Sequence, residues 1–262
     1  MDVYLDRSQS AAGIPAIVLS RELCSCDSEQ LLQEIAQLHE AGISSVSIRR
    51  QQVARIGQEK LSYLLEDAGI TVSSLGYCGG FTGTLERTFD EAMLDTARAV
   101  DEALQLKARS LIILPGARGN HTWKHSLKSV RIGLQGAISH AGAAQLQFLV
   151  PTESLLGRSQ DGLTVPGDVA EWLDQNTSSR VQSLIVVRGR GSRRQLPANW
   201  QRSLLSGASL RICSRSETYV WNRRLLGKMV SALSAGQQPG RSANPDFTNN
   251  QAWAASTSEN AR

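Results

Sequence analysis

The chain lacks several features that mark particular classes of protein. Cysteine occurs only four times in 262 residues and never as a C-x-x-C pair, which is far below the density of a disulfide scaffold. No run of 18 apolar residues is present, which argues against a membrane-spanning helix. The first seven residues carry two acids and no long apolar core, unlike a secretory signal. The expectation is a cytoplasmic protein with reduced thiols and no membrane association.

Lysine is also scarce, with five residues, whereas arginine is abundant and unevenly placed. Ten arginines and a single acid, Glu217, lie between Arg180 and Arg224. Arginine favours bidentate contact with carboxylate or phosphate, so this stretch is either an anion-binding site or a solvated basic face with internal ion pairs. Aromatic residues make up only 5% of the chain, and few are available to stack on bases. Nucleic acid is therefore a disfavoured partner.

Short apolar runs alternate with longer amphipathic stretches along most of the chain. The runs that predict strands are 14–19, 43–48, 70–75, 110–114, 145–150, 181–187 and 209–213. The stretches that predict helices are 28–41, 58–68, 90–106, 124–140, 166–175, 199–205 and 217–233. Regular alternation of this period is typical of βα units and a parallel sheet.

Seven clear βα units without a dinucleotide-binding glycine fingerprint favour a TIM-like α/β barrel over a doubly wound sheet. No eighth strand is evident, because the chain after Leu233 is rich in glycine, proline and asparagine. Either the barrel is incomplete, or Asp2–Asp6 helps to close it. The expected organisation is one barrel domain, residues 10–235, and a flexible C-terminal tail, residues 236–262.

One segment resembles a known family. Residues 69–81 read GITVSSLGYCGGF, which resembles the third strand and following loop of xylose-isomerase-like TIM barrels, the sugar phosphate isomerase/epimerase family. Arg49 and Arg50 resemble a tryptophan-arginine pair after the second strand, and Pro115-Gly116 resembles the turn after the fourth. The likeness spans about residues 14–220 and is weak after 150.

The resemblance implies chemistry at the carboxyl ends of the strands and a divalent metal held there by carboxylates and a histidine. This chain has Val150 where the family has its first glutamate, Arg188 where it has an aspartate and Cys213 where it has a histidine. The metal ligands therefore look lost. No metal cofactor is expected, and the catalytic residues stay unidentified.

Three alternatives for a metal remain open. Glu153 substitutes for the missing glutamate if its loop bends inward. His121 and His125 have i, i+4 spacing and would share a helix face. The four cysteines, Cys24, Cys26, Cys78 and Cys213, are all expected near one barrel mouth, where they form either a zinc thiolate site or buried inert thiols.

Two classes of function follow from these expectations. The first is an isomerase or epimerase of a sugar or sugar phosphate, and the second is a pseudoenzyme that binds a small carbohydrate, an anionic ligand or a partner without catalysis. A homo-oligomer remains open. An endonuclease-like zinc cluster is disfavoured because the chain has only four histidines. The ligand-binding candidates, which should all follow strands at one end of the barrel, are Arg49, Arg50, Arg118, Glu153, Arg188 and Arg190.

Overall fold

The computed structural model describes residues 2–6, 16–40, 42–83, 87–118, 120–155, 163, 166–188 and 209–213. All of them lie in the first of the two units into which the chain divides, Met1–Ser216. Arg190, the helices expected at 199–205 and 217–233, and the expected tail at 236–262 lie outside the described residues. The proposed domain limits therefore stay predictions.

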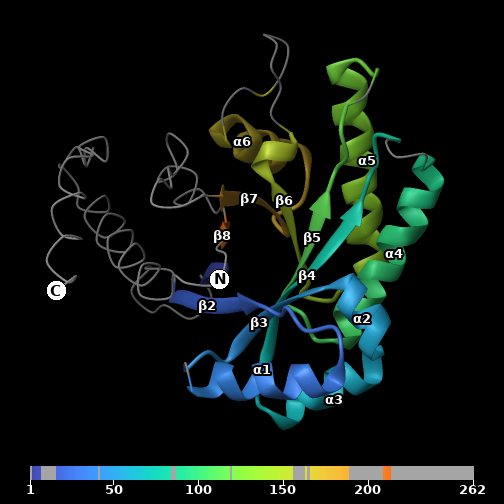
Figure 1. The fold of residues 1–262 in the computed structure, drawn as a ribbon. Helices are drawn as coiled ribbons and strands as arrows, with labels where there is room; N and C mark the ends of the chain where they lie inside the picture. The colour runs from blue at the N-terminus through green and yellow to red at the C-terminus, as the bar shows by residue number, and fades with distance from the viewer. Residues whose placement is uncertain are drawn as a thin grey trace, which may run out of the picture. The chain divides into compact units, whose positions relative to one another are not determined.

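Eight strands form a closed barrel in the order of the sequence (Figure 1). Their bounds are β1 Asp2–Asp6, β2 Ala16–Glu22, β3 Ser45–Arg49, β4 Thr71–Gly79, β5 Ser110–Leu114, β6 Gln147–Pro151, β7 Val181–Arg188 and β8 Ser209–Cys213. Successive strands from β2 to β8 pair in parallel. The TIM-like fold class and all seven expected strands are confirmed.

The first strand closes the barrel. β1 pairs antiparallel with both β2 and β8, with Asp2 in register with Ser20 on one side and Arg211 on the other. A parallel crossover needs a dozen or more residues, and only nine separate β1 from β2, so the antiparallel direction follows from the short connection. The alternative in which Asp2–Asp6 completes the barrel is the one that the structure adopts.

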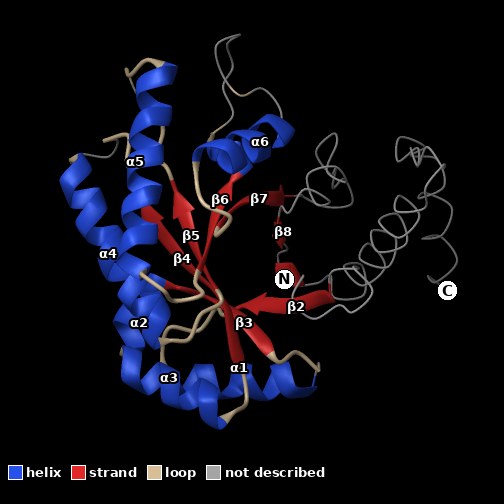
Figure 2. Cartoon of the chain, turned by 180° about the vertical axis from the view of Figure 1, so that it is seen from behind, coloured by secondary structure: helices blue, strands red, loops and turns tan. Residues whose placement is uncertain are grey.

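The described helices lie outside the ring of strands (Figure 2). They are α1 Ser28–Glu40, α2 Arg50–Ile56, α3 Gln58–Asp67, α4 Phe89–Gln105, α5 Trp123–Ala141 and α6 Pro166–Asn176, with a single 3₁₀ turn, η1, at Thr152–Ser154. Helix α2 is an addition to the elements expected from the sequence. At the start of α1 the carboxylate of Asp27 accepts hydrogen bonds from the backbone N–H of Glu29 and Gln30, at 2.9 and 3.1 Å. Asp27 is therefore the N-cap of α1.

Alternation along the strands separates two apolar regions. Leu111 and Ile113 of β5 belong to the large core that includes the inner faces of the helices. Ile112, between them, packs instead with Leu149 and Leu184 in a separate buried cluster. Because successive side chains of a strand point to opposite faces, this second cluster fills the inside of the barrel. Residues an even number of positions from a member of this second cluster, on the same strand, therefore also face the barrel interior or its rim.

Candidate ligand-binding site at the carboxyl end of the barrel

The carboxyl ends of the parallel strands meet at one rim of the barrel, where TIM-barrel proteins carry their sites. Glu22 and Arg49 are the last residues of β2 and β3, and Arg188 is the last residue of β7. Glu22 is in register with Ser47, so Arg49 lies two residues further along β3 on the same face of the sheet. The rim therefore has charged residues at several strand ends.

Glu22 and Arg49 form an ion pair, with Arg49 Nε donating to Glu22 Oε1. The Arg49 side chain is 53% exposed and that of Glu22 is 23% exposed. Sequence reasoning identified Arg49 but missed Glu22, because the strand expected at 14–19 ended three residues too early. A signal was available, since Glu22 is the first acid after the apolar run.

The loop after β2 is held by a buried carboxylate from α1. Glu34 accepts hydrogen bonds from the backbone N–H of Cys24 at 3.0 Å, and from the N–H and hydroxyl of Ser25 at 3.0 and 2.7 Å. Its side chain lies among the buried polar groups of the structure, with the residue only 7% exposed. Buried carboxylates require such donors, so this loop and α1 are fixed to each other.

Gln52 of α2 braces the same loop from the other side. Its amide nitrogen donates to the carbonyl oxygens of Leu23 and Ser25, both at 2.9 Å. Its amide oxygen accepts from the backbone N–H of Arg49 at 2.9 Å. One buried side chain thus fixes both the loop after β2 and the end of β3, which makes this part of the rim rigid.

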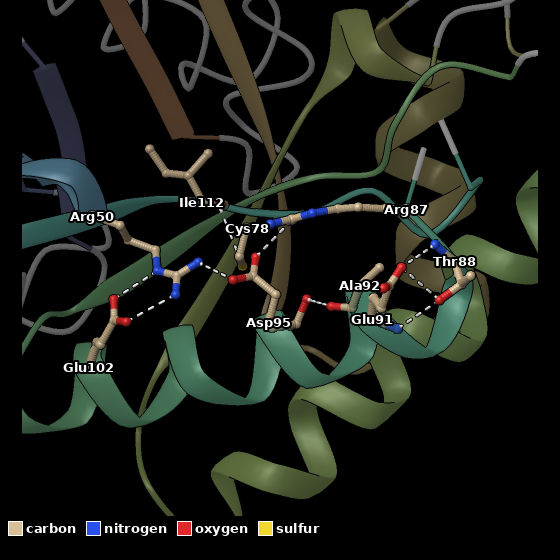
Figure 3. Close-up of polar contacts among 10 residues, drawn as sticks. Arg50, Cys78, Arg87, Thr88, Glu91, Ala92, Asp95, Glu102 and Ile112 are labelled. Atoms are coloured by element: carbon tan, nitrogen blue, oxygen red, sulfur yellow. Dashed lines mark hydrogen bonds and ion pairs between the residues drawn. The ribbon is translucent and has the colours of Figure 1, made fainter. Parts of the chain in front are cut away.

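Arg50, although adjacent to Arg49 in the sequence, contacts a different part of the fold (Figure 3). Its Nε and Nη2 donate to the two carboxylate oxygens of Glu102 at 2.7 and 2.9 Å, and its Nη1 donates to Asp95 at 2.9 Å. Asp95 also accepts from Arg87 at 3.2 Å. Hydrogen bonding to Glu102, and then to Asp95, raises the pKa of Arg50 above its usual value despite partial burial. These contacts join α2 to α4, and they place the guanidinium on α4 carboxylates rather than beside Arg49.

Arg118 and both histidines lie on the β5–α5 segment. Arg118 is exposed, and its carbonyl oxygen accepts from the backbone N–H of His121 at 3.2 Å. The rings of His121 and His125 stack with centroids 4.8 Å apart, but His121 precedes α5, so the two residues do not share a helix face as expected. Thr122 caps α5 by accepting from the His125 N–H at 3.3 Å. Within the described part of the chain, no group of three or more His, Cys, Asp or Glu residues is placed to hold a metal ion.

The end of β6 carries Glu153 and an unexpected orientation of Val150. Val150 is fully buried and belongs to the large core, while Leu149 packs inside the barrel. The side chain at position 150 therefore faces the helices. The resemblance implied a metal ligand at this position, but here the position does not point into the barrel. Glu153 lies in the turn η1, directly after β6, and is exposed.

The cysteines divide between the rim loop and the core. Cys24 is exposed and Cys26 half-buried, both in the loop after β2. Cys78 is buried in the large core, where desolvation raises the pKa of its thiol to about 12. The expectation that all four cysteines point to one mouth is therefore wrong for Cys78. Cys213 is in register with Arg188 at the ends of β8 and β7.

Two exposed large side chains near the carboxyl ends of β4 and β5 were not anticipated. Tyr77 is 38% exposed and Leu114 is 39% exposed. The register between β4 and β5 shifts between Gly76 and Cys78, so Tyr77 is the extra residue of a bulge. Bulges re-aim side chains next to binding sites. Leu114 is in register with Gly79 at the end of the neighbouring strand, and Tyr77 precedes Gly79 by two residues.

No protein-family model matches the chain, and no curated protein matches it. Solved structures do. 3-Keto-D-glucoside 4-epimerase, YcjR, from E. coli aligns with a TM-score of 0.61 and 14% identity over 82% of this chain and 87% of that chain. L-ribulose 3-epimerase aligns at 0.58 and 10% identity, over 85% and 99%. Protein SMc04130 from Sinorhizobium meliloti 1021 aligns at 0.56 and 17% identity, over 81% and 96%.

These likenesses show that the chain shares the barrel fold of these proteins, which agrees with the TIM-like fold expected from the sequence. In the described part of the chain, no helix is both long enough and apolar enough to cross a membrane.

Proposed function

We propose that the carboxyl-end rim binds a small carbohydrate or carbohydrate-derived anion, in a barrel that has lost the metal centre implied by the resemblance. The proposal is supported chiefly by the charged residues at the strand ends. Glu22, Arg49 and Arg188 are the last residues of their strands, and Arg118 and Glu153 lie in the segments after β5 and β6. Arg190, which lies outside the described residues, follows Arg188 by two positions in the sequence and is included as a prediction. Guanidinium groups pair bidentately with the carboxylate of a sugar acid or with a phosphate.

The ligand class is also suggested by structural neighbours. Two of the aligned proteins are described as a 3-keto-D-glucoside 4-epimerase and an L-ribulose 3-epimerase, which act on carbohydrates. The exposed ring of Tyr77 and the side chain of Leu114 suit such a ligand, because the C–H faces of a sugar pack against apolar surface while its hydroxyls reach charged groups.

The donors at the strand ends do not fit a catalytic divalent metal. On β6, Leu149 offers no lone pair to the barrel interior, and Val150 faces the helices. The last residue of β7 is an arginine, Arg188, a residue type that is cationic at all working pH values and is not a metal ligand. Cys213, at the end of β8, is a soft ligand that suits magnesium and manganese poorly. No step of the proposed function depends on a metal.

A second candidate function is metal-independent epimerisation, and the placement of two carboxylates favours it. Glu22 ends β2 and Glu153 follows β6, and these strands are four apart in a closed barrel of eight. The two residues therefore belong to opposite sides of the rim. Inversion at a carbon next to a carbonyl requires one group to remove a proton from one face and another to return a proton to the other face.

A thermal-shift screen with inorganic phosphate, a sugar phosphate, a sugar acid and a neutral sugar tests the binding proposal. A ligand at 100 times its Kd stabilises the folded state by about 2.7 kcal/mol, which raises Tm by mass action. The shift should be lost in the Arg188→Ala/Arg190→Ala double variant. It should persist in Arg98→Ala/Arg131→Ala, which removes two exposed arginines from α4 and α5. A shift that is absent, or equal in both double variants, contradicts the proposal.

Deuterium incorporation separates the two candidate functions. The protein is incubated with a ligand from the screen that carries a carbonyl group, in deuterium oxide, and the adjacent carbon is monitored by NMR. Epimerisation predicts exchange that is lost in both Glu22→Gln and Glu153→Gln. Binding without exchange assigns the protein to the non-catalytic class.

A further inference from the structure

Two thiols in the rim loop are not used by the proposed ligand site. Cys24 and Cys26 flank Ser25 between β2 and α1, and both are in the reduced form. Cys24 is exposed and Cys26 half-buried. The remaining thiol with described surroundings, that of Cys78, is buried in the core. Of the three thiols whose surroundings the structure describes, solvent therefore reaches only the two in this loop.

Cys24 and Cys26 are two residues apart in one loop, a spacing at which a single ion can bridge both sulfurs. Cys26 Sγ is 3.9 Å from the carbonyl oxygen of Cys24, so the second sulfur packs against the first residue. Cys24 Sγ is 3.7 Å from the carbonyl oxygen of Glu22, so each sulfur contacts the residue two positions before its own. Metal–sulfur bonds are about 2.3 Å long, so a linear two-coordinate ion holds its sulfurs about 4.6 Å apart. Cα atoms two residues apart are separated by at most about 7 Å, and χ1 rotation brings the sulfurs to that spacing.

The loop that carries the thiols is already ordered. The backbone N–H groups of Cys24 and Ser25 donate to the buried carboxylate of Glu34, and Gln52 donates to the carbonyl of Ser25. An ion that binds here orders two side chains rather than a flexible segment, which lowers the entropic cost of binding.

The charges near the loop favour a cation. Glu22 precedes the thiols and Asp27 follows them, and Glu34 lies beneath the loop. The nearby Arg49 is paired with Glu22. By contrast, the stacked His121 and His125 lie at the start of α5 beside Lys124, where the positive end of the helix disfavours a metal ion.

We propose that Cys24 and Cys26 form a two-thiolate site for a soft monovalent cation, Cu(I). Thiolates select Cu(I) or zinc, and zinc sites take about four ligands. No cluster of three or more His, Cys, Asp or Glu residues occurs in the described ranges, which leaves two ligands and favours the ion that two sulfurs satisfy. Each thiol releases its proton to solvent as one S–Cu bond forms, and copper stays in the +1 state, so no oxidant or reductant is needed. The site does not depend on carbohydrate binding at the rim.

The test is an anaerobic titration of the full reduced chain with Cu(I) buffered by the chromogenic chelator bicinchoninate. The protein should withdraw one equivalent of Cu(I). Cys24→Ser and Cys26→Ser should each weaken the affinity at least about 100-fold, because even the loss of a group that only supports a metal ligand costs about 10–100-fold. Cys78→Ala is the matched control and should bind like the wild type.

Three results would overturn the proposal. In the first, the protein withdraws no Cu(I) from the chelator. In the second, it still withdraws Cu(I) when either cysteine is replaced by serine. In the third, Cys213→Ser loses as much affinity as Cys24→Ser, which would indicate a larger thiolate cluster. The circular dichroism spectrum of each variant establishes that it is folded before titration.

Discussion

Replacement of Glu34 by alanine is expected to destabilise the protein by about 3 kcal/mol. The carboxylate accepts from three donors in the rim loop, the N–H of Cys24 and the N–H and hydroxyl of Ser25. Hydrogen bonds to a charged group contribute about 1.5–3 kcal/mol each. The sum over three such bonds is an upper limit for the loss of unfolding free energy, and it lies well above the loss expected here. The loop is only partly buried, so water replaces part of each lost bond, and about 1 kcal/mol per donor remains.

Urea unfolding measures this loss, and amide hydrogen exchange locates it. The N–H groups of Cys24 and Ser25 should exchange much faster in Glu34→Ala, while the strand amides of β5 should change only with global stability. Glu40→Ala is the matched control, because it removes an exposed glutamate from the same helix and should change stability by less than about 0.5 kcal/mol. Equal stability of the two variants, or unchanged exchange at Cys24 and Ser25, would refute the role assigned to Glu34.

Three further predictions concern the Arg50 ion pairs, the accessibility of the cysteines and the pKa of Glu91. Arg50→Met should destabilise the protein by about 1–3 kcal/mol by urea unfolding, since it removes the cation that Glu102 and Asp95 share and leaves Asp95 with Arg87 alone among these arginines; stability like that of the wild type would contradict this. A thiol reagent at pH 8 should label Cys24 and Cys26 in the folded protein but Cys78 only after unfolding, because burial raises the pKa of Cys78 to about 12; labelling of native Cys78 would be the opposite result. The backbone N–H and then the hydroxyl of Thr88 donate to the Glu91 carboxylate and lower its pKa, so this contribution to stability is present above the unfolded pKa and is lost as pH falls through the lower folded value. Thr88→Ala removes only the hydroxyl, so NMR titration should show the pKa of Glu91 rising part of the way; an unchanged pKa would contradict this.

The strands were predictable where a local apolar run marks them, and less so where closure depends on distant partners. Ser110–Leu114 and Ser209–Cys213 have the predicted limits. The segment Asp2–Asp6 is too short for its sequence pattern alone to identify a strand. It forms a strand by pairing with the free edges of β2 and β8, which are distant from each other in the sequence. Helix α2 was missed because it begins directly after β3 with polar residues and is only seven residues long.

The candidate site was predictable in position but not in its internal contacts. Arg49 and Arg50 are adjacent residues of the same type, and the sequence does not distinguish them. Arg49 pairs with Glu22 at the rim, whereas Arg50 pairs with Glu102 on α4. Glu34 reads as an ordinary charged residue on an amphipathic helix, since its burial depends on a loop that packs over it. Tyr77 is exposed at a bulge in β4 that no local sequence pattern predicts.

The most direct test of the central claim is isothermal titration calorimetry with the ligand that gives the largest thermal shift. It compares the wild type with Arg49→Ala and Arg87→Ala, which remove arginines of similar exposure, 53% and 51%, each paired with a carboxylate. Arg49 lies at the rim, whereas Arg87 pairs with Asp95 of α4. Rim binding predicts that the wild type and Arg87→Ala bind with the same Kd and that Arg49→Ala loses at least about tenfold in affinity, or 1.4 kcal/mol. The same Kd in all three proteins would contradict the proposed site.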